Sequence, residues 1–406
     1  MEKCIVCNKK SLTRVIELGL HPPADSFVVD CGKENAQKFY QLSCMLCESC
    51  GHLQNEVVVP NNERYVDTDY SYTSSNSKIS MNHWSEYFAT VSKKIKLQND
   101  DIVIEFGSND GYLLELFSNK AKTVGIEPSP YLCDISRQRG LDVINGYLGK
   151  ETINDFIEEN GLAKLIYGNN VYNHINELNE STFAIRSGLR KDGYFVFESP
   201  YCLDIIDKYY FDTIYHEHLS YFSIRSVDCL LKKNSLYIVS IERNTYHGGS
   251  VRVYSSPDSS KYNKDLVNDY IQNEIKSGLF DLSTYDKYMS KITKDRYFSV
   301  GKILEMKKKG MSIAAVGAAA RSNTLLNYYK LDSTIIDFIT DSSEHKIGKL
   351  TPGTCIPILD DNALIERDPD VAIILSWNIG KFLLEKIKNI NPNMKIITIG
   401  GKELLW

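Results

Sequence analysis

The chain has 406 residues, a length that favours two or three domains. Hydrophobic residues make up 43% and charged residues 24%, a balance that excludes a largely disordered chain. No stretch approaches the roughly 18 apolar residues of a membrane span, and the opening MEKCIVCNKK lacks the features of a signal peptide. The net charge of -5 argues against a nucleic-acid-binding protein. We therefore expect a cytoplasmic protein without membrane or nucleic-acid partners.

Six of the ten cysteines lie in the first fifty residues, and four of these form two Cys-x-x-Cys pairs. The paired residues are Cys4, Cys7, Cys47 and Cys50. In a reducing compartment, clustered cysteines indicate metal ligands before disulfides, and four thiolates suit a closed, structural zinc site. Cys31 and Cys44 are further thiols that could compete as ligands, and buried free thiols are the alternative. The spacing predicts a zinc-binding module over residues 1–64.

The segment DIVIEFGSNDGYLLELF predicts a buried strand over residues 102–106, a glycine turn and a helix. The next strand ends at Glu127, 20 residues after Gly107. A Rossmann-like unit places at this offset the acid that binds a ribose diol. The full G-x-G-x-x-G pattern is absent, however, and the turn carries Asp110, whose carboxylate would repel a pyrophosphate. The pattern therefore favours a cationic cofactor without phosphate.

S-adenosylmethionine (SAM) meets these conditions, because it has a ribose and a sulfonium cation but no phosphate. An αβ unit without a ligand is the alternative. Later strands end at Asn169 and Glu198, and the carboxyl ends of parallel strands face the ligand crevice of an open sheet. The expected SAM-binding residues are Glu105, Gly107, Asn109, Asp110, Gly111, Glu127, Asn169 and Asn170.

The segment FDTIYHEHLSYFS, residues 211–223, concentrates polar side chains that are costly to bury unpaired. These side chains belong to Tyr215, His216, Glu217, His218, Ser220 and Tyr221. The His-x-His pair could bind a metal, one histidine could act as a general base, or the segment could be a polar loop. Downstream, HGGS at residues 247–250 places two glycines before a strand. They indicate a close approach of the backbone to a ligand, or only a tight turn.

These motifs run in one order over nearly the whole chain, and VGAAARSNTLLNYY and GKLTPGTCIPI follow near its carboxyl end. In this combination the chain resembles the SAM-dependent sugar C-methyltransferases of deoxysugar biosynthesis, typified by the C-3 methyltransferases of tetronitrose-type sugars. The resemblance implies an α/β protein of three parts. They are a zinc-binding module (1–64), a Rossmann-like SAM-dependent methyltransferase domain (65–254) and a second Rossmann-like domain (255–406).

The resemblance also implies a reaction, in which a nucleotide-linked 4-keto-6-deoxy sugar loses the proton at C3 and the enolate carbon receives the methyl group. A C–H bond beside a carbonyl is only weakly acidic, so the site needs a base and donors that stabilise the oxyanion. By motif position His218 is the expected base, and Tyr215 and Glu217 orient it or the sugar. Tyr72 and His174 match the polar residues that hold or polarise the keto group.

The carboxyl-terminal part contains a second strand–turn–helix unit at Gly317, and its next strand ends at Asp341, 24 residues further on. An NAD-binding dehydrogenase is a competing interpretation, although only one turn glycine remains. The resemblance implies that this domain helps to hold the sugar nucleotide. Arg321 could pair with its pyrophosphate, or it could be a solvated surface arginine. The expected substrate-binding residues are Tyr72, His174, Glu198, His247, Gly248, Arg321 and Asn323.

Two further functions compete with the sugar C-methyltransferase. One is a zinc-stabilised nucleotide-binding or RNA-binding module without catalysis, and the acidic net charge argues against it. The other is methylation of oxygen or nitrogen, which needs less help from a base than methylation of carbon. His216 stands where some family members carry Asp, which weakens the assignment of a sugar from those members. We expect a monomer, and a thymidine-linked substrate before a guanosine-linked one for a surface polysaccharide.

Overall fold

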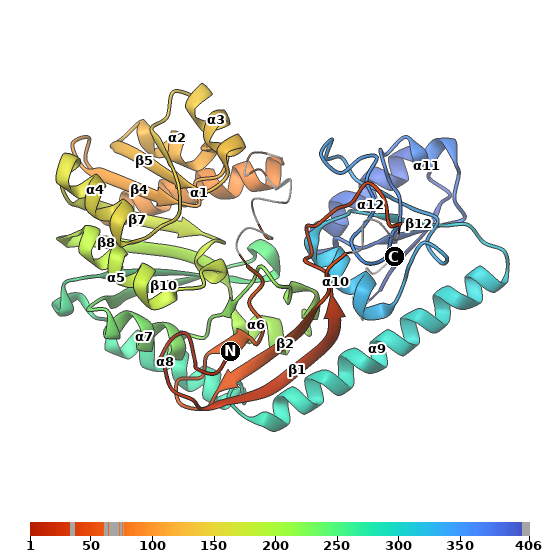
Figure 1. Cartoon of the computed structure of the whole chain (residues 1–406), viewed down its shortest axis with the longest axis horizontal. Helices are drawn as coiled ribbons and strands as arrows, with labels where there is room; N and C mark the ends of the chain where they lie inside the picture. The colour runs from red at the N-terminus through yellow and green to blue at the C-terminus, as the bar shows by residue number, and fades with distance from the viewer. Residues whose placement is uncertain (33–36, 61–63, 65–72, 74, 76, 400–406) are drawn as a thin grey trace.

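The structure is a computed structural model that describes residues 1–32, 37–60, 64, 73, 75 and 77–399. These residues form three β-sheets with helices packed around them, the α/β fold that the sequence predicts (Figure 1). We call the parts that contain the three sheets the amino-terminal, middle and carboxyl-terminal units. Among the described residues, every helix is too short or too polar to cross a lipid bilayer.

The amino-terminal sheet takes its fourth strand from the middle of the chain. Strands β1 (Leu12–His21), β2 (Tyr40–Cys47) and β3 (Leu53–Asn55) are antiparallel, and β9 (Ser220–Tyr221) pairs with β3. The order is β1-β2-β3-β9. The polar segment 211–223 therefore ends in the edge strand of the amino-terminal sheet, so the amino-terminal unit supports this segment directly.

The middle sheet has seven strands in the order β10-β11-β8-β7-β4-β5-β6. Their bounds are β4 Ile102–Phe106, β5 Lys122–Glu127, β6 Val143–Asn145, β7 Ala163–Asn169, β8 Leu189–Pro200, β10 Tyr237–Asn244 and β11 Ser250–Ser256. Neighbouring strands from β8 to β6 are parallel, whereas β11 is antiparallel to both β8 and β10. The predicted strands at residues 102–106 and ending at Glu127 are confirmed.

Helices cover both faces of the middle sheet, because successive side chains of a strand point to opposite faces. Val103 of β4 packs in one cluster with helices α1 and α2, and Ile104 packs in another with α4, α5 and α7. The helix bounds are α1 Lys78–Ile95, α2 Tyr112–Ser118, α3 Pro130–Gln138, α4 Lys150–Asn160, α5 Leu178–Gly188, α6 Cys202–Asp207 and α7 Ile224–Lys233. This layering leaves the carboxyl ends of the parallel strands as the ligand-facing edge.

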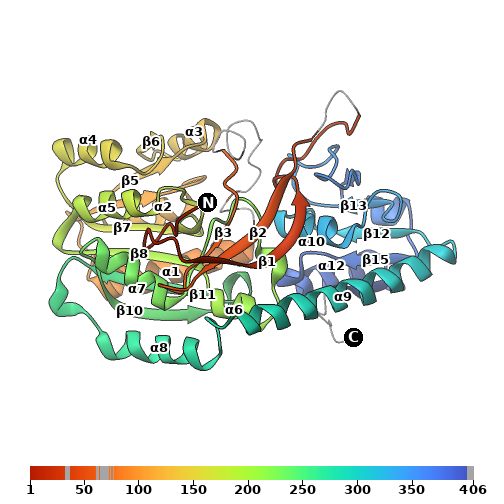
Figure 2. The ribbon, with the colours of Figure 1, turned by 60° about the horizontal axis from the view of Figure 1, so that its bottom comes forward.

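The carboxyl-terminal unit is a second parallel sheet, in the order β14-β13-β12-β15-β16. Its strands are β12 Ile313–Val316, β13 Phe338–Thr340, β14 Ile358–Leu359, β15 Val371–Ile374 and β16 Lys395–Thr398. Helix α8 (Lys264–Lys276) precedes this unit and packs on α7 and β10 of the middle unit, and α9 (Leu282–Lys308) follows it. The helices of the carboxyl-terminal unit itself are α10 Ala320–Tyr329, α11 Ala363–Glu366 and α12 Gly380–Ile390. The long helix α9 runs beneath the molecule from the middle unit to the carboxyl-terminal unit (Figures 1 and 2). We propose domain boundaries near residues 64 and 254.

The β1–β2 hairpin is an arm that reaches from the amino-terminal unit to the carboxyl-terminal unit (Figure 2). Beyond β1, the carbonyl of Ala24 accepts a hydrogen bond of 2.7 Å from the Asn323 amide of α10. Near the tip, Cys31 forms a disulfide with Cys355. The expectation that the cysteines are reduced thiols or metal ligands is therefore wrong for this pair, whose partners lie 324 residues apart and could not be matched by spacing.

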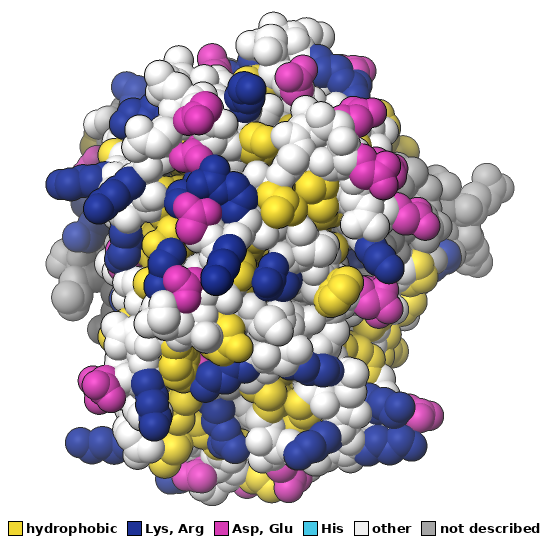
Figure 3. Space-filling model, turned by 90° about the vertical axis from the view of Figure 1, so that its left-hand side faces the viewer, with side chains coloured by type: hydrophobic (Ala, Val, Ile, Leu, Met, Phe, Trp, Pro, Cys, Tyr) yellow, Lys and Arg dark blue, Asp and Glu magenta, His cyan; other side chains and the backbone are white. Residues whose placement is uncertain are grey.

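One side of the middle unit is turned away from the carboxyl-terminal unit (Figure 3). On this face Lys and Arg side chains are scattered, with Asp and Glu side chains and apolar patches among them. The face carries no continuous field of one sign, which is what the small net charge of the chain leads us to expect.

Candidate functional site

The two cysteine pairs of the amino-terminal unit meet at one point. The cluster consists of Cys4, Cys7, Cys47 and Cys50, whose sulfur atoms all lie within 4.8 Å of one another. The closest pairs are 3.5 and 3.6 Å apart. A tetrahedral zinc ion with Zn–S bonds of about 2.3 Å needs sulfur separations of about 3.8 Å. The donor set fits a closed structural zinc site. Cys44 lies outside it, where its thiol donates to Asn55.

The cysteine turns also dock onto the middle unit. Arg225 of α7 donates a hydrogen bond of 3.1 Å to the carbonyl of Ser49, between the second pair. Asn179 of α5 donates one of 3.0 Å to the carbonyl of Val6, between the first pair. A bound metal therefore fixes not only the small module but also the surface through which it contacts the middle unit.

The predicted glycine turn and acid of the middle unit lie together at the ends of β4 and β5. Gly107 has φ +64°, and an added Cβ would lie 2.6 Å from Val171, so the close packing of this loop requires glycine. The Glu127 carboxylate accepts hydrogen bonds of 2.9 Å from the backbone N–H groups of Asn109 and Ser129. Each carboxylate oxygen retains a second lone pair, so Glu127 can brace the turn and still accept from ribose hydroxyls.

The neighbouring polar groups fit a SAM molecule at this edge. Asp110 accepts a hydrogen bond from the Ser75 hydroxyl, which brings the segment before α1 to the turn. The amide atoms of Asn170 are buried, and no described residue hydrogen-bonds them. Such unsatisfied groups are costly unless a ligand binds them. Glu105 differs from the expectation, because its carboxyl group accepts from Tyr167 and burial raises its pKa well above the ordinary value. A neutral Glu105 would contribute little to binding a cation.

The carboxyl-terminal unit reproduces the same local arrangement. Asp341 accepts hydrogen bonds of 2.8 and 2.9 Å from the N–H groups of Ala318 and Ser343. An added Cβ on Gly317 would lie 2.4 Å from the Ser376 hydroxyl, so close packing requires glycine at this turn as it does at Gly107. The turn has one glycine, where a dinucleotide-binding turn has the G-x-G-x-x-G pattern.

His218 lies at the centre of segment 211–223. Its Nδ1 is 2.8 Å from the carbonyl oxygen of Thr213, which can only accept, so Nδ1 carries the hydrogen. Its Nε2 is 2.7 Å from the Tyr215 hydroxyl, which donates to it. Burial lowers the pKa of His218 well below its ordinary value, and His174, whose ring lies 4.8 Å away, lowers it further. The imidazole is therefore neutral, and its basic nitrogen faces Tyr215.

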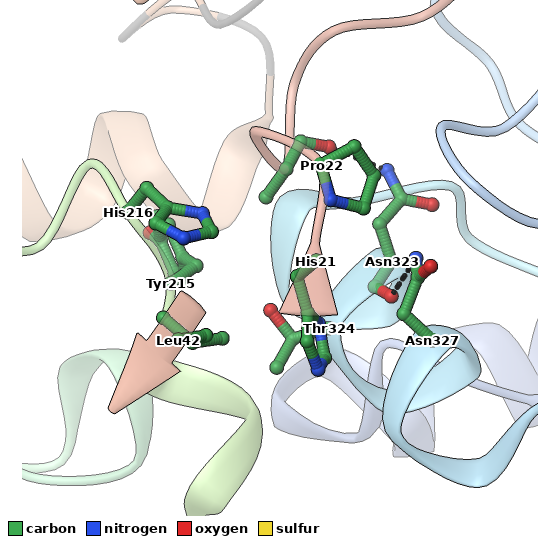
Figure 4. Close-up of a pocket in the computed structure, with 9 residues that line it drawn as sticks. His21, Pro22, Leu42, Tyr215, His216, Asn323, Thr324 and Asn327 are labelled. Carbon is green, nitrogen blue, oxygen red and sulfur yellow. Dashed lines mark hydrogen bonds between the residues drawn. The ribbon is translucent and has the colours of Figure 1, made fainter. Parts of the chain in front are cut away.

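Two expected partners of His218 are arranged otherwise. Glu217 is buried beside Asp25 rather than against His218, and burial followed by this carboxylate raises its pKa to about 7. His216 lies in a narrow pocket with His21, Tyr215 and Asn323 (Figure 4), and burial lowers its pKa to about 4. Tyr72 lies outside the described residues. The structure thus brings Tyr215 and His174 to His218, and it turns Glu217 away.

Glu198, expected to bind substrate, is engaged within the protein. Its carboxylate receives Arg252 at 2.9 Å and His83 of α1 at 2.6 Å. Burial would raise the pKa of Glu198, but the His83 hydrogen bond and the Arg252 charge hold it below its ordinary value. The His83 ring stacks on Tyr246, with centroids 3.9 Å apart. Sequence reasoning missed His83, for which the only signal was a polar ring on an otherwise buried helix face.

The two glycines after His247 allow a close approach of other side chains of this protein, not of a ligand. Gly248 has φ +91°, and an added Cβ would lie 2.7 Å from the ring of Trp377 in the carboxyl-terminal unit. The Arg321 guanidinium lies over the same indole, 4.6 Å from its centroid, and donates to the His247 carbonyl at 3.3 Å. The Arg321 side chain is only 11% exposed, so it is not a solvated surface arginine. Sequence reasoning missed Trp377, which carries no motif.

Among the residues that the structure describes, the four-cysteine cluster is the one group of three or more side chains that could hold a metal. The His216 ring lies in the pocket with His21, whereas the His218 ring is hydrogen-bonded to Thr213 and Tyr215, so the two rings do not face a common point. The metal interpretation of the His-x-His pair therefore has no support in the described part of the chain, and the general-base and polar-loop interpretations remain.

Replacing Cys47 with Ser should abolish stoichiometric zinc and lower the melting temperature, because one of four thiolates is lost and metal binding supplies folding energy. Metal content by mass spectrometry and thermal unfolding would measure both effects. Cys44→Ser is the matched control in the same strand, and it should retain zinc. A Cys47→Ser protein with full zinc content would contradict the four-thiolate site.

Replacing Glu127 with Ala should weaken SAM binding about tenfold or more, because hydrogen bonds to a charged acceptor are lost. Isothermal titration with SAM would measure the change. Asp341→Ala is the matched control, since this carboxylate holds the equivalent turn of the other Rossmann-like unit. If only Asp341→Ala weakened SAM binding, the cofactor would bind in the carboxyl-terminal unit, and the assignment to the middle unit would be wrong.

Three family models match successive parts of the chain. A zinc binding domain model matches residues 4–65, a methyltransferase domain model matches residues 81–241, and a C-methyltransferase C-terminal domain model matches residues 245–398. The C-methyltransferase NovU of Streptomyces niveus is 27% identical over 396 residues, which cover 97% of this chain and 94% of that protein.

Solved methyltransferases match part of the chain. A SAM-dependent methyltransferase of Clostridium acetobutylicum is 12% identical, with a TM-score of 0.34 over 44% of this chain and 92% of that one. Magnesium protoporphyrin IX methyltransferase of Synechocystis is 12% identical, with a TM-score of 0.33 over 43% of this chain and 78% of that one. At these scores the likeness carries no further conclusion. The three successive models and the full-length relative together support a SAM-dependent C-methyltransferase, with SAM as its cofactor and zinc in its amino-terminal unit.

Proposed function

We propose that this C-methyltransferase acts on C3 of a nucleotide-linked 4-keto-6-deoxy sugar in the biosynthesis of a deoxysugar for a polysaccharide or natural product. The observation that carries the proposal is the neutral His218, whose basic nitrogen is aimed at a tyrosine hydroxyl in a buried site. Methylation of carbon needs such a base, because the carbon must first lose a proton. A ketone beside that carbon makes the loss feasible, since the negative charge moves to oxygen.

Bound SAM would supply an electrophilic methyl group on a cationic sulfur, held by Glu127, Asn170 and the glycine turn. The C3–H bond of the sugar breaks, and its electron pair forms an enolate across C3 and C4. The Tyr215 hydroxyl, which already donates to Nε2 of His218, passes its hydrogen to Nε2 and takes up the C3 proton in its place. The methyl group that bound SAM would supply goes to C3, which would leave S-adenosylhomocysteine and a branched sugar.

Two of the residues proposed to hold the sugar nucleotide lie near His218 or share a pocket with its partner Tyr215. His174 lies against His218, and Asn323 of α10 lines the same pocket as Tyr215, from the opposite side (Figure 4). The side-chain oxygen of Asn323 is buried, and no described residue donates to it, so it suits a hydroxyl or N–H group of the substrate. We propose that Tyr72 and His247 contribute as well. Glu198 would act through His83 rather than by direct contact.

Replacing His218 with Asn should lower kcat about 10²- to 10⁴-fold, because Asn has no basic nitrogen that can accept the proton. The affinity for SAM should be nearly unchanged, because His218 is not among the residues proposed to bind SAM. Turnover and SAM titration would measure the two effects. The exchange of deuterium from heavy water into C3, with S-adenosylhomocysteine present, should disappear with turnover.

His345→Asn is the control for replacing a histidine, since His345 is exposed in the carboxyl-terminal unit. Unchanged turnover in His218→Asn would eliminate His218 as the base. Lost turnover with retained deuterium exchange would show that another group removes the proton.

A panel of sugar nucleotides with isotope-labelled SAM tests the substrate class. Mass spectrometry should find one methyl group added to a 4-keto-6-deoxy sugar nucleotide and none added to its 4-hydroxy counterpart, because only the ketone acidifies C3. Equal methylation of the 4-hydroxy sugar would contradict the proposed chemistry.

A further inference from the structure

Arg321 projects from α10 of the carboxyl-terminal unit into the middle unit. One guanidinium nitrogen donates to the Thr213 hydroxyl, and another donates at 3.3 Å to the carbonyl of His247. Its Nε lies 3.5 Å from the carboxylate of Asp212, which also accepts from the Trp377 indole. Four partners from three segments of the chain therefore surround one side chain. A planar guanidinium suits such a site, because its donors lie in a fixed fork.

Thr213 connects Arg321 to His218. Its hydroxyl accepts from Arg321, and its carbonyl oxygen accepts the Nδ1 hydrogen of His218 at 2.8 Å. Thr213 ends the short 3₁₀ turn Phe211–Thr213, so its side chain and its carbonyl move with the same few backbone dihedrals. Fixing the hydroxyl therefore limits the motion of the carbonyl.

We infer that Arg321 is a positioning residue for His218: it holds Thr213 from the carboxyl-terminal unit, so that the Thr213 carbonyl keeps the hydrogen of His218 on Nδ1. The inference rests on the proposed role of His218 as base. The partner of one ring nitrogen decides which tautomer an imidazole adopts. When the carbonyl is held, Nε2 carries the lone pair that a base requires. When it is released, hydrogen can reside on Nε2 instead, and this tautomer cannot accept a proton there.

This role replaces the expectation that Arg321 pairs with the pyrophosphate of the substrate. The charge of Arg321 already faces Asp212, and its planar face already rests on Trp377. A pyrophosphate would have to displace these contacts and release Thr213. The carboxyl-terminal unit therefore contributes to the base as well as to substrate binding, which gives a physical reason why the two units are closely docked.

Matched pairs of variants separate positioning from substrate binding. Thr213→Val removes the hydroxyl acceptor with little change of shape, and Thr213→Ser retains it. Arg321→Met removes the fork, and Arg321→Lys keeps only a point charge. The first readout is the ¹⁵N spectrum of histidine-labelled protein without substrate, in which the His218 signals are identified by their absence in His218→Asn.

The wild type and Thr213→Ser should show His218 with its hydrogen on Nδ1. Thr213→Val and Arg321→Met should both shift the signals towards the Nε2–H tautomer. In turnover, kcat should fall about tenfold in these two variants, whereas KM for the sugar nucleotide should stay within about twofold, because a positioning contact and not a binding contact is lost. Arg321→Lys should fall between the wild type and Arg321→Met.

An unchanged His218 spectrum in both Thr213→Val and Arg321→Met would overturn the inference. So would a raised KM with unchanged kcat, which would return Arg321 to the pyrophosphate. If Arg321→Met does not fold, the Thr213→Val and Thr213→Ser pair decides alone. The spectra need no substrate, so they test the positioning even if His218→Asn keeps its turnover, a result that would instead remove the proposed base.

Discussion

The hydrogen bond from Nδ1 of His218 to the carbonyl oxygen of Thr213 is the constraint on which the proposed chemistry depends. A buried imidazole with no fixed partner could hold its hydrogen on either nitrogen, and only one of these forms presents a lone pair to Tyr215. The protein secures this bond from several sides. Strand β9 anchors the end of the segment in the amino-terminal sheet, and the N–H of Leu219 donates at 2.8 Å to the carbonyl of Asn173 in the middle unit.

All three units therefore contact the segment 211–223, and together they hold it in place. The middle unit presents the cofactor edge, with Glu127 bracing the glycine turn. The amino-terminal unit is too small to bury a large core alone, and metal binding at its cysteine cluster would supply folding energy to the unit whose strand β3 pairs with β9. The carboxyl-terminal unit closes the other side through α10, and the β1–β2 arm with its Cys31–Cys355 disulfide ties it to the amino-terminal unit.

Local signals in the sequence were enough to predict the strands that flank the glycine turn and to predict SAM and zinc as cofactors. The Cys-x-x-Cys spacing predicted the zinc ligands, and the distance from Gly107 to Glu127 predicted the cofactor edge, because each depends on residues that are close in the chain or on adjacent strands. Contacts between distant segments left no such signal. The disulfide, the pairing of His83 with Glu198, and the approach of Arg321 to Thr213 join residues between 108 and 324 positions apart. Glu217 was assigned by motif position, and the fold turns its side chain towards Asp25.

The role of His218 as base is best tested by a crystal structure of the protein with S-adenosylhomocysteine and an unreactive 4-keto sugar nucleotide. We expect C3 of the sugar within about 3.5 Å of the Tyr215 hydroxyl or of Nε2 of His218, and the donor sulfur at methyl-transfer distance from C3. A complex in which C3 faces another ionisable group, with the His218 ring remote and still bonded only within the protein, would contradict it.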